Sequence, residues 1–412
     1  MNSFLKKILR GDTTIWLVFL LLCIGSALIM YSASSTLAYK ASSYSKPMLQ
    51  HAGYLALGIG LAYGIHLIPY KIIRVLSYLG IIVSIVFLIL VQFKGITENG
   101  ATRWFSLFGF QFQPSEIAKL SLIMVVADFI SRIKDNDSES ERVWFRRIML
   151  LSGFICLIIF KDNISTALLL FGIIFCMMFI GRISFKRLGI IVLVVFALCI
   201  SGYGVGKAML SLPSESAINK LPLVNRLPTM TGRIDRFFIG EEDADKYKIT
   251  DATLQPKRSM IAIANGGIFG VGPGNSVQRD YLPQAYSDFI YAIVIEEGGL
   301  LVGIFLILLY LILLFRAGQI ATKCDSVFPA LLVIGLCLMV VFQAFISMAV
   351  ATGLGPVTGQ PLPLISRGGT SIIITSVYFG IILGVTRQIK ENGRKQAEET
   401  ASEIPLVELD EI

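Results

Sequence analysis

Asp288 is the residue best placed for acid–base chemistry, because it stands between a long polar segment and an apolar run. A carboxylate at the start of a helix is commonly a cap, stabilised by free N–H groups and the helix dipole. At the mouth of a cavity, the same carboxylate could take a proton from a substrate hydroxyl or hold a divalent cation. Glu296 and Glu297 follow, about 12 Å deeper along a continuous helix. We interpret them either as structural or as cavity-lining groups.

A second polar stretch, residues 99–120, combines Arg103 with a proline and two charged residues. Pro114 is predicted to begin a helix, because the missing N–H of a proline would be unpaired in a first helical turn anyway. Glu116 and Lys119 then lie three residues apart on one helical face. They could form an ion pair that only locks helices together, but ionisable residues inside a membrane boundary favour a functional polar cavity.

The third stretch, residues 355–371, is rich in proline and glycine and includes Ser366. Such a sequence cannot form a continuous helix. Irregular backbone at a membrane is tolerated only where protein or a watery cavity surrounds it. Composition alone leaves two interpretations open, a rigid turn and a substrate-lining loop.

Composition indicates that these stretches are positioned by membrane helices. The sequence has 412 residues, of which 55% are hydrophobic and 16% charged, unlike a soluble domain. A spanning helix requires about 20 mostly apolar residues, and the sequence predicts about ten such helices. The predicted fold class is therefore an all-α polytopic membrane protein. Its predicted spans are residues 13–34, 51–69, 71–93, 114–131, 147–160, 165–182, 187–207, 289–315, 327–350 and 370–387. The fifth and sixth spans are hard to delimit, so a count of about nine stays open.

Lys and Arg residues concentrate in every second connection, which predicts that those connections and both termini are cytoplasmic. Residues 1–12 are then a cytoplasmic N-terminus, residues 13–387 the membrane domain, and residues 388–412 a cytoplasmic, disordered tail. The long segment 208–288 falls on the outer face and ends at Asp288. The net charge of +8 follows from this topology, since dispersed basic residues at membrane boundaries favour lipid headgroups over nucleic acid.

Cysteine and histidine usage indicates neither crosslinks nor a zinc site. None of the six cysteines lies in the large outer segment, so no disulfide framework is predicted. His51 and His66 have no cysteine partner at ligand spacing, and packed or interfacial histidines are expected instead.

Taken together, the polar stretches resemble signatures of the SEDS family (shape, elongation, division and sporulation), whose members FtsW and RodA polymerise peptidoglycan from lipid II. The matching residues are Gly100, Ala101, Arg103, Trp104, Phe112 to Glu116 and Lys119, then Gly270-Val271-Gly272, Gly274-Asn275-Ser276, Tyr281-Leu282-Pro283 and Asp288-Phe289-Ile290, then Pro356 to Gly359, Pro361-Leu362-Pro363, Ile365-Ser366 and Gly368-Gly369. Departures from the pattern occur at Asp162-Asn163, Gln284, Tyr286 and Arg367, which receive no catalytic role. The opening residues 11–35 resemble division-type members (FtsW) more than elongation-type members (RodA).

The resemblance implies a glycosyltransferase that acts at the outer face of the bacterial cytoplasmic (inner) membrane, at the division septum. It implies that Asp288 is the catalytic general base. The 4-hydroxyl of one lipid II would attack the anomeric carbon of a lipid-linked glycan, and undecaprenyl pyrophosphate would leave. The implied substrate-binding candidates are Arg103, Glu116, Lys119, Arg279 and Ser366. A divalent cation (Mg²⁺ or Mn²⁺) is implied, with Asp288 as one candidate ligand, and the implied partners are a class B penicillin-binding protein and divisome proteins.

Other functions fit parts of the sequence. A lipid II flippase would also combine many spans with buried charge. However, no inverted repeat is visible, and the polar stretches gather on the predicted outer face. An inactive scaffold would leave the context of Asp288 unexplained. Within the family, the alternative is a RodA-like elongation polymerase.

Overall fold

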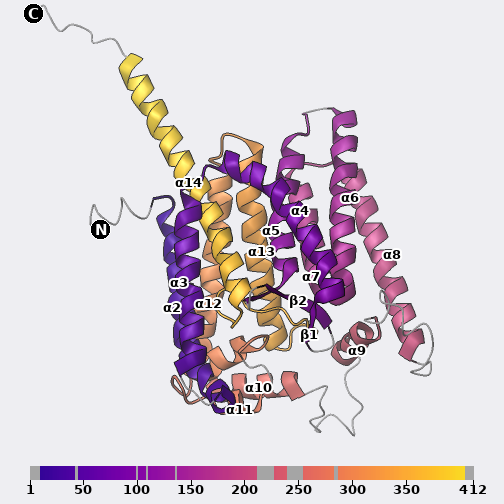
Figure 1. The fold of residues 1–412 in the computed structure, drawn as a ribbon, viewed down its shortest axis with the longest axis vertical. Helices are drawn as coiled ribbons and strands as arrows, with labels where there is room; N and C mark the ends of the chain where they lie inside the picture. Colours follow the sequence, from indigo (N-terminus) through magenta and orange to yellow (C-terminus); the bar gives the residue numbers. More distant parts are fainter. Residues whose placement is uncertain are drawn as a thin grey trace, which may run out of the picture.

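The structure, a computed structural model, describes residues 10–41, 45–98, 101–107, 110–134, 137–210, 227–238, 254–282 and 286–403. Its helices are α2 Thr13–Ala41, α3 Ser45–His66, α4 Tyr70–Lys94, α5 Pro114–Ser131, α6 Ser138–Asp162, α7 Ile164–Ile180, α8 Phe185–Leu210, α9 Leu227–Phe238, α10 Leu254–Gly266, α11 Gln278–Tyr281, α12 Ile290–Ala321, α13 Val327–Ala351 and α14 Gly369–Glu403. The long helices run side by side in one bundle, with α9, α10 and α11 gathered at one end (Figure 1).

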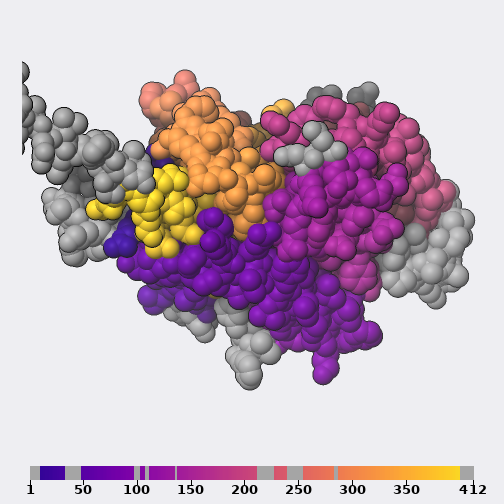
Figure 2. Space-filling model, turned by 90° about the horizontal axis from the view of Figure 1, so that it is seen from above, coloured from indigo at the N-terminus to yellow at the C-terminus, as the bar shows by residue number. Residues whose placement is uncertain are grey.

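The bundle has an interior helix and apolar outer faces. α13 packs against α5, α7, α12 and α14, and most of its side chains are buried. α8 lies at the edge, where Leu193 and Phe196 are 70% and 65% exposed. Apolar side chains that point outward, like these two of α8, are suited to lipid. At the end where α14 leaves the bundle, it lies between the N-terminal elements in indigo and purple and an orange segment (Figure 2).

Each of the ten predicted spans falls on a helix, and Pro114 begins α5 as predicted. Among the described residues, seven helices are long and apolar enough to cross a membrane: α2, α4, α6, α8, α12, α13 and α14. α7 is apolar but shorter. α3 and α5 are outside this group of seven, and α5 contains Glu116, Lys119 and Asp128. The number of crossings beyond these seven stays a prediction.

A small sheet corrects the prediction of an all-α fold. Strands β1 Ile96–Glu98, β2 Ala101–Leu107 and β3 Phe110–Phe112 form a three-stranded antiparallel sheet in the order β1-β2-β3. The aromatic and β-branched residues of this segment favour strands, and the sheet packs on α4 through Phe87, whose ring contacts those of Phe105 and Phe112. The sheet positions Arg103 and Trp104 between α4 and α5.

A break in α12 corrects the expected depth of Glu296 and Glu297. Gly299 has φ +75° and ψ 178°, a conformation that is accessible almost only to glycine. The two parts of α12 fold against each other there, since the Tyr291 hydroxyl donates to the Gly303 carbonyl at 3.1 Å. In a continuous helix these residues would be about 18 Å apart. Residues 290–298 and 300–321 are therefore two separate parts of α12 rather than one continuous helix.

Gly299→Ala is expected to destabilise the protein by about 1–3 kcal/mol, because the alanine would have to adopt this backbone conformation. Its Cβ would also lie 2.1 Å from the carbonyl oxygen of Ile268. Gly318→Ala, in the same helix with no heavy atom within 4 Å of the added Cβ, is the matched control. Thermal unfolding of the two variants in detergent checks this expectation, and equal unfolding temperatures would contradict it.

Two helices extend furthest beyond their predicted bounds. α6 begins at Ser138, where Asp137 accepts hydrogen bonds from the N–H groups of Glu139 and Ser140. The tail expected to be disordered from residue 388 instead continues α14 to Glu403, and only the residues after it lie outside the described part. Strong helix formers and the ion pairs Arg387–Glu391 and Arg394–Glu398 explain this extension.

Candidate active site

Asp288 is held just before α12, but it does not cap the helix. The N-cap position is Phe289, which makes no side-chain cap hydrogen bond. The Asp288 carboxylate accepts a hydrogen bond from the Ser287 hydroxyl at 2.9 Å. Burial raises the pKa of Asp288, while the Ser287 hydrogen bond and the positive charges of Arg103 and Arg233 oppose the rise. A partly buried carboxylate with a raised pKa is better suited to accepting a proton than a fully exposed one.

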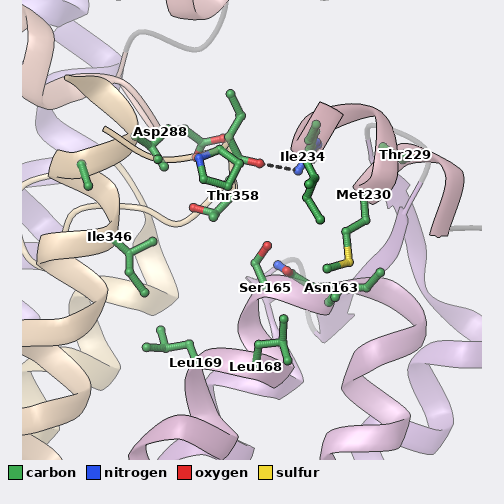
Figure 3. A pocket seen from close by; sticks show the side chains of 18 of the residues that line it. Asn163, Ser165, Leu168, Leu169, Thr229, Met230, Ile234, Asp288, Ile346 and Thr358 are labelled. Atoms are coloured by element: carbon green, nitrogen blue, oxygen red, sulfur yellow. Dashed lines mark hydrogen bonds between the residues drawn. The ribbon is translucent and has the colours of Figure 1, made fainter. Parts of the chain in front are cut away.

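The apolar chamber, a cavity of about 830 Å³, lies on one side of Asp288. Its walls come from α7, α9, α13 and residues 355–359. Figure 3 shows side chains from these helices around one hollow, with Asp288 and Thr358 at its edge. Leu168, Leu169 and Ile346 make its wall predominantly apolar, so the cavity is suited to a hydrocarbon chain.

The polar chamber, a second cavity of about 500 Å³, lies next to the same carboxylate. Its wall is rich in amide, hydroxyl and charged side chains. They include Gln50, His51, Tyr54, Gln111, Gln113, Glu116, Thr166, Gln360, Arg367 and Thr370. Among the described residues, four line both chambers: Arg103, Asn163, Asp288 and Gly359. Asp288 therefore lies at the junction of an apolar and a polar cavity.

The third stretch fixes the position of Asp288. Ser366 donates to the Ser287 carbonyl at 2.7 Å and accepts from the Leu362 N–H at 2.7 Å. Gly359 adopts φ +67°, and a Cβ placed there would lie 3.5 Å from Asp288 Oδ2. Of the two interpretations left open for this stretch, the structure supports a cavity-lining loop. Ser366 itself lines neither chamber and acts on Asp288 through its neighbour.

Arg103 presents unused hydrogen-bond capacity at the junction. Its Nε atom is buried and has no hydrogen-bond partner among the described residues, and the same is true of Trp104 Nε1. Trp104 lines the polar chamber, and Arg103 lines both chambers. Buried donors are rarely left unpaired, so a bound oxygen-rich ligand would satisfy them.

Glu116 and Lys119 form the buried ion pair that one interpretation of the sequence predicts. Lys119 Nζ lies 2.8 Å from Glu116 Oε1 and donates to Gln343 Oε1 at 3.2 Å. Gln343 in turn donates to the Pro361 carbonyl at 3.0 Å. Lys119 is only 1% exposed and lines neither chamber, whereas Glu116 lines the polar one. Both residues lie on α5, so Lys119 joins α5 to α13 through Gln343, while Glu116 contributes to the wall of the polar chamber.

Arg279 is not brought to Asp288. Its Nη1 donates to the carbonyl oxygen and the hydroxyl of Ser32, at 2.9 and 3.0 Å, and lies 3.9 Å from Glu297. Glu296 accepts hydrogen bonds from the Ser276 hydroxyl and the Gln278 N–H. None of these residues lines either chamber. Both glutamates instead have hydrogen-bond or ion-pair partners within the fold. The substrate-binding role of Arg279 stays a prediction.

Two further contacts near Asp288 were not predicted. Arg233 on α9 lines the apolar chamber and donates to the Val357 carbonyl at 2.8 Å. The helical spacing of Leu227, Met230 and Ile234 in the long outer segment is the sequence signal for this amphipathic helix. The second contact is between Arg367 and Tyr286, which both depart from the family pattern. The guanidinium carbon of Arg367 lies 5.4 Å from the centre of the Tyr286 ring.

The acidic residues do not fit a metal ion held by protein ligands alone. Among the described residues, no group of three or more His, Cys, Asp or Glu side chains is placed to hold one. Asp162 and Glu116 also line the chambers, but Asp162 accepts from Gln92 at 2.7 Å and Glu116 is paired with Lys119. Asp288 is thus the carboxylate that remains at the junction.

The sequence matches a family of known proteins. The sequence profile of the FtsW, RodA and SpoVE family, described as cell cycle proteins, matches residues 12–391. The chain is 32% identical over 380 residues to a probable peptidoglycan glycosyltransferase FtsW of Thioalkalivibrio sulfidiphilus, covering 90% of this chain and 88% of that one. It is 32% identical over 398 residues to the protein of the same name from Enterococcus hirae, with 92% and 94% covered.

Solved structures show the same fold. A chain of a peptidoglycan synthase complex superimposes with a TM-score of 0.66 at 23% identity, covering 92% of this chain and 98% of that one. The crystal structure of the rod shape determining protein RodA of Thermus thermophilus gives a TM-score of 0.64 at 22% identity, with 93% and 98% covered. By its sequence and its fold, this chain belongs to the FtsW, RodA and SpoVE family of cell cycle proteins.

Proposed function

We propose that this chain, a peptidoglycan glycosyltransferase, polymerises lipid II at Asp288, at the outer face of the cytoplasmic membrane. The observation that carries the proposal is the position of Asp288 at the junction of an apolar and a polar cavity. A lipid-linked sugar also has an apolar part and a polar part, since a hydrocarbon chain is joined through pyrophosphate to a hydroxyl-rich saccharide. The bond that breaks lies between the pyrophosphate and the sugar, which corresponds to the junction.

Asp288 acts as the general base in this proposal. Its carboxylate takes the proton of the 4-hydroxyl of the incoming sugar, and the oxygen attacks the anomeric carbon of the lipid-linked glycan. A new C–O bond forms, the bond from the anomeric carbon to the pyrophosphate oxygen breaks, and undecaprenyl pyrophosphate leaves with that electron pair. General bases are most effective when their pKa approaches the working pH, which the burial of Asp288 favours.

Arg103 and Arg233 are proposed to stabilise the negative charge that develops on the departing pyrophosphate. Both line the apolar chamber, and both act electrostatically on Asp288. Fixed cationic donors in a buried site stabilise such charge more strongly than they would in water. A Mg²⁺ or Mn²⁺ ion is proposed to arrive bound to the pyrophosphate. Asp288 would be its protein ligand, and the ion would neutralise phosphate charge.

Lipid II and the nascent glycan strand are the proposed substrates, and a class B penicillin-binding protein and divisome proteins are the proposed partners, at the division septum. The peptidoglycan synthase complex whose chain shares this fold supports a partner in a general way. Ten crossings with both termini in the cytoplasm are likewise proposed, supported by the distribution of Lys and Arg residues. This topology places the end of the bundle that contains α9, α10 and α11 outside the membrane.

Arg103→Gln is expected to lower the rate of strand synthesis by about 10- to 100-fold, since a fixed donor to the developing charge is lost. Arg103→Lys should retain part of the rate, because the charge remains while the Nε donor is removed. Arg142→Gln, which alters an arginine whose side chain is 75% exposed, is the control and should have no effect. Gel analysis of strands made from labelled lipid II measures these rates. Parent-like rates for Arg103→Gln would exclude Arg103 from the site.

A further inference from the structure

Arg367 is a cation of the polar chamber that the proposed reaction does not use. Its guanidinium lies over the Tyr286 ring, and its backbone N–H donates to the Tyr286 carbonyl at 2.9 Å. In the described part of the chain, no carboxylate lies within ion-pairing distance of this guanidinium. A partly buried arginine that lacks an anionic partner has unused capacity to bind one.

Among the described lining residues of the polar chamber, the other arginine is Arg103. Lys119 lines neither chamber and is occupied by Glu116. Arg103 lies at the junction, where the pyrophosphate must remain because it is attached to the lipid chain. An anion that reaches Arg367 in the polar chamber therefore belongs to the other end of the substrate, which consists of the saccharide and its attached peptide.

The contact with Tyr286 leaves the donors of Arg367 available. A cation–π contact of this kind, with the guanidinium carbon 5.4 Å from the ring centre, occupies none of the N–H groups in a hydrogen bond. Two parallel N–H groups match the two oxygens of a carboxylate, which is why arginine is preferred at such sites. The backbone next to the ring is held close to Asp288, because the Ser287 carbonyl accepts from Ser366 and the Tyr286 carbonyl accepts from the Arg367 N–H.

We infer that Arg367 binds a free carboxylate of the peptide on the incoming lipid II, and that Tyr286 is the positioning residue that orients it. This inference rests on the proposed function, because it assigns one wall of the same site. Arg367 would make the enzyme selective for substrates whose peptide is negatively charged. Substrates with amidated peptide carboxylates would bind without this contact.

The test uses the full-length chain in detergent with two probes, lipid II with free peptide carboxylates and lipid II with those carboxylates amidated. Arg367→Gln should raise KM for the free-carboxylate substrate about tenfold, leave kcat within about twofold, and leave KM for the amidated substrate unchanged. Arg367→Lys should give an intermediate KM. Tyr286→Leu, which removes the ring, should raise KM for the free-carboxylate substrate only.

The amidated substrate also serves as the control for folding, because a misfolded variant would lose activity with both probes. An equal change in KM for the two substrates, or a loss of kcat with both, would overturn the inference and assign Arg367 to the pyrophosphate or to the fold. Failure of the parent chain to make strands would instead refute the proposed function. If the parent polymerises both substrates with the same KM, only the role of Arg367 fails.

Discussion

Asp288→Asn is expected to reduce strand synthesis by at least about 10²- to 10⁴-fold, because an amide cannot accept the proton of the sugar hydroxyl. The substitution preserves the size of the side chain and its hydrogen bond with Ser287. Burial raises the pKa of Asp288 above its ordinary value of 3.8, so the ionised carboxylate destabilises the folded state at neutral pH. This destabilisation disappears as pH falls through the raised pKa, and asparagine removes it at every pH. The unfolding temperature of the variant should therefore be no lower than that of the parent.

The same pKa predicts the pH dependence of the parent enzyme. The base is lost as pH falls through the raised pKa, so the acidic limb of kcat/KM should lie above pH 3.8. Asp280→Asn is the matched control, since this neighbouring aspartate is 56% exposed and lines neither chamber. It should retain the rate and the pH profile of the parent. An Asp288→Asn variant that keeps the acidic limb and the parent rate would exclude Asp288 as the base.

Glu116→Ala is expected to destabilise the protein by about 3–5 kcal/mol, because it leaves a buried ammonium group without its counter-ion. Lys119 is 1% exposed, and among the described residues its other hydrogen-bond partner is the amide oxygen of Gln343, at 3.2 Å. Thermal unfolding in detergent measures the effect. Glu139→Ala removes one partner of an exposed pair, 3.8 Å apart with side chains 76% and 75% exposed, and should cause no measurable change.

The double variant Glu116→Gln/Lys119→Gln separates the stability of the pair from its place in the site. Both charges are removed together and an amide still faces Gln343, so most of the lost stability should return. The KM for lipid II should remain higher than that of the parent, because the Glu116 carboxylate lines the polar chamber. A double variant that is no more stable than Glu116→Ala would show that the unpaired charge of Lys119 is not the cause of the lost stability.

The sequence predicted the convergence of its polar stretches better than the shapes of the elements that position them. Pro114 correctly indicated the start of α5, and Glu116, Asp288 and Gly359 from three separate stretches line one chamber. The convergence followed from topology, because alternating basic connections predict which ends of the helices face the same side. Arg279 was the exception, since its interaction with Ser32 on α2 depends on tertiary packing.

The missed features have physical reasons. Strands β1 to β3 are only three to seven residues long, and short strands depend on packing contacts such as those of Phe87 more than on a visible alternation. The break in α12 is hidden in an apolar run, where only the pair Gly298-Gly299 indicates it. Arg233 reaches the site on a short amphipathic helix within a long segment that was treated as a loop.

Strand synthesis in detergent micelles tests the central claim most directly, because micelles have no opposing leaflets between which a lipid could be moved. The purified chain, alone and together with its proposed transpeptidase partner, is incubated with labelled lipid II, and products are resolved by length beside the Asp288→Asn variant. The account predicts glycan strands from the parent, with one undecaprenyl pyrophosphate released for each linkage, and none above background from the variant. Strands from both proteins at equal rates would contradict the role of Asp288. Absence of strands from the parent, together with transfer of lipid II across liposome bilayers, would indicate a carrier instead.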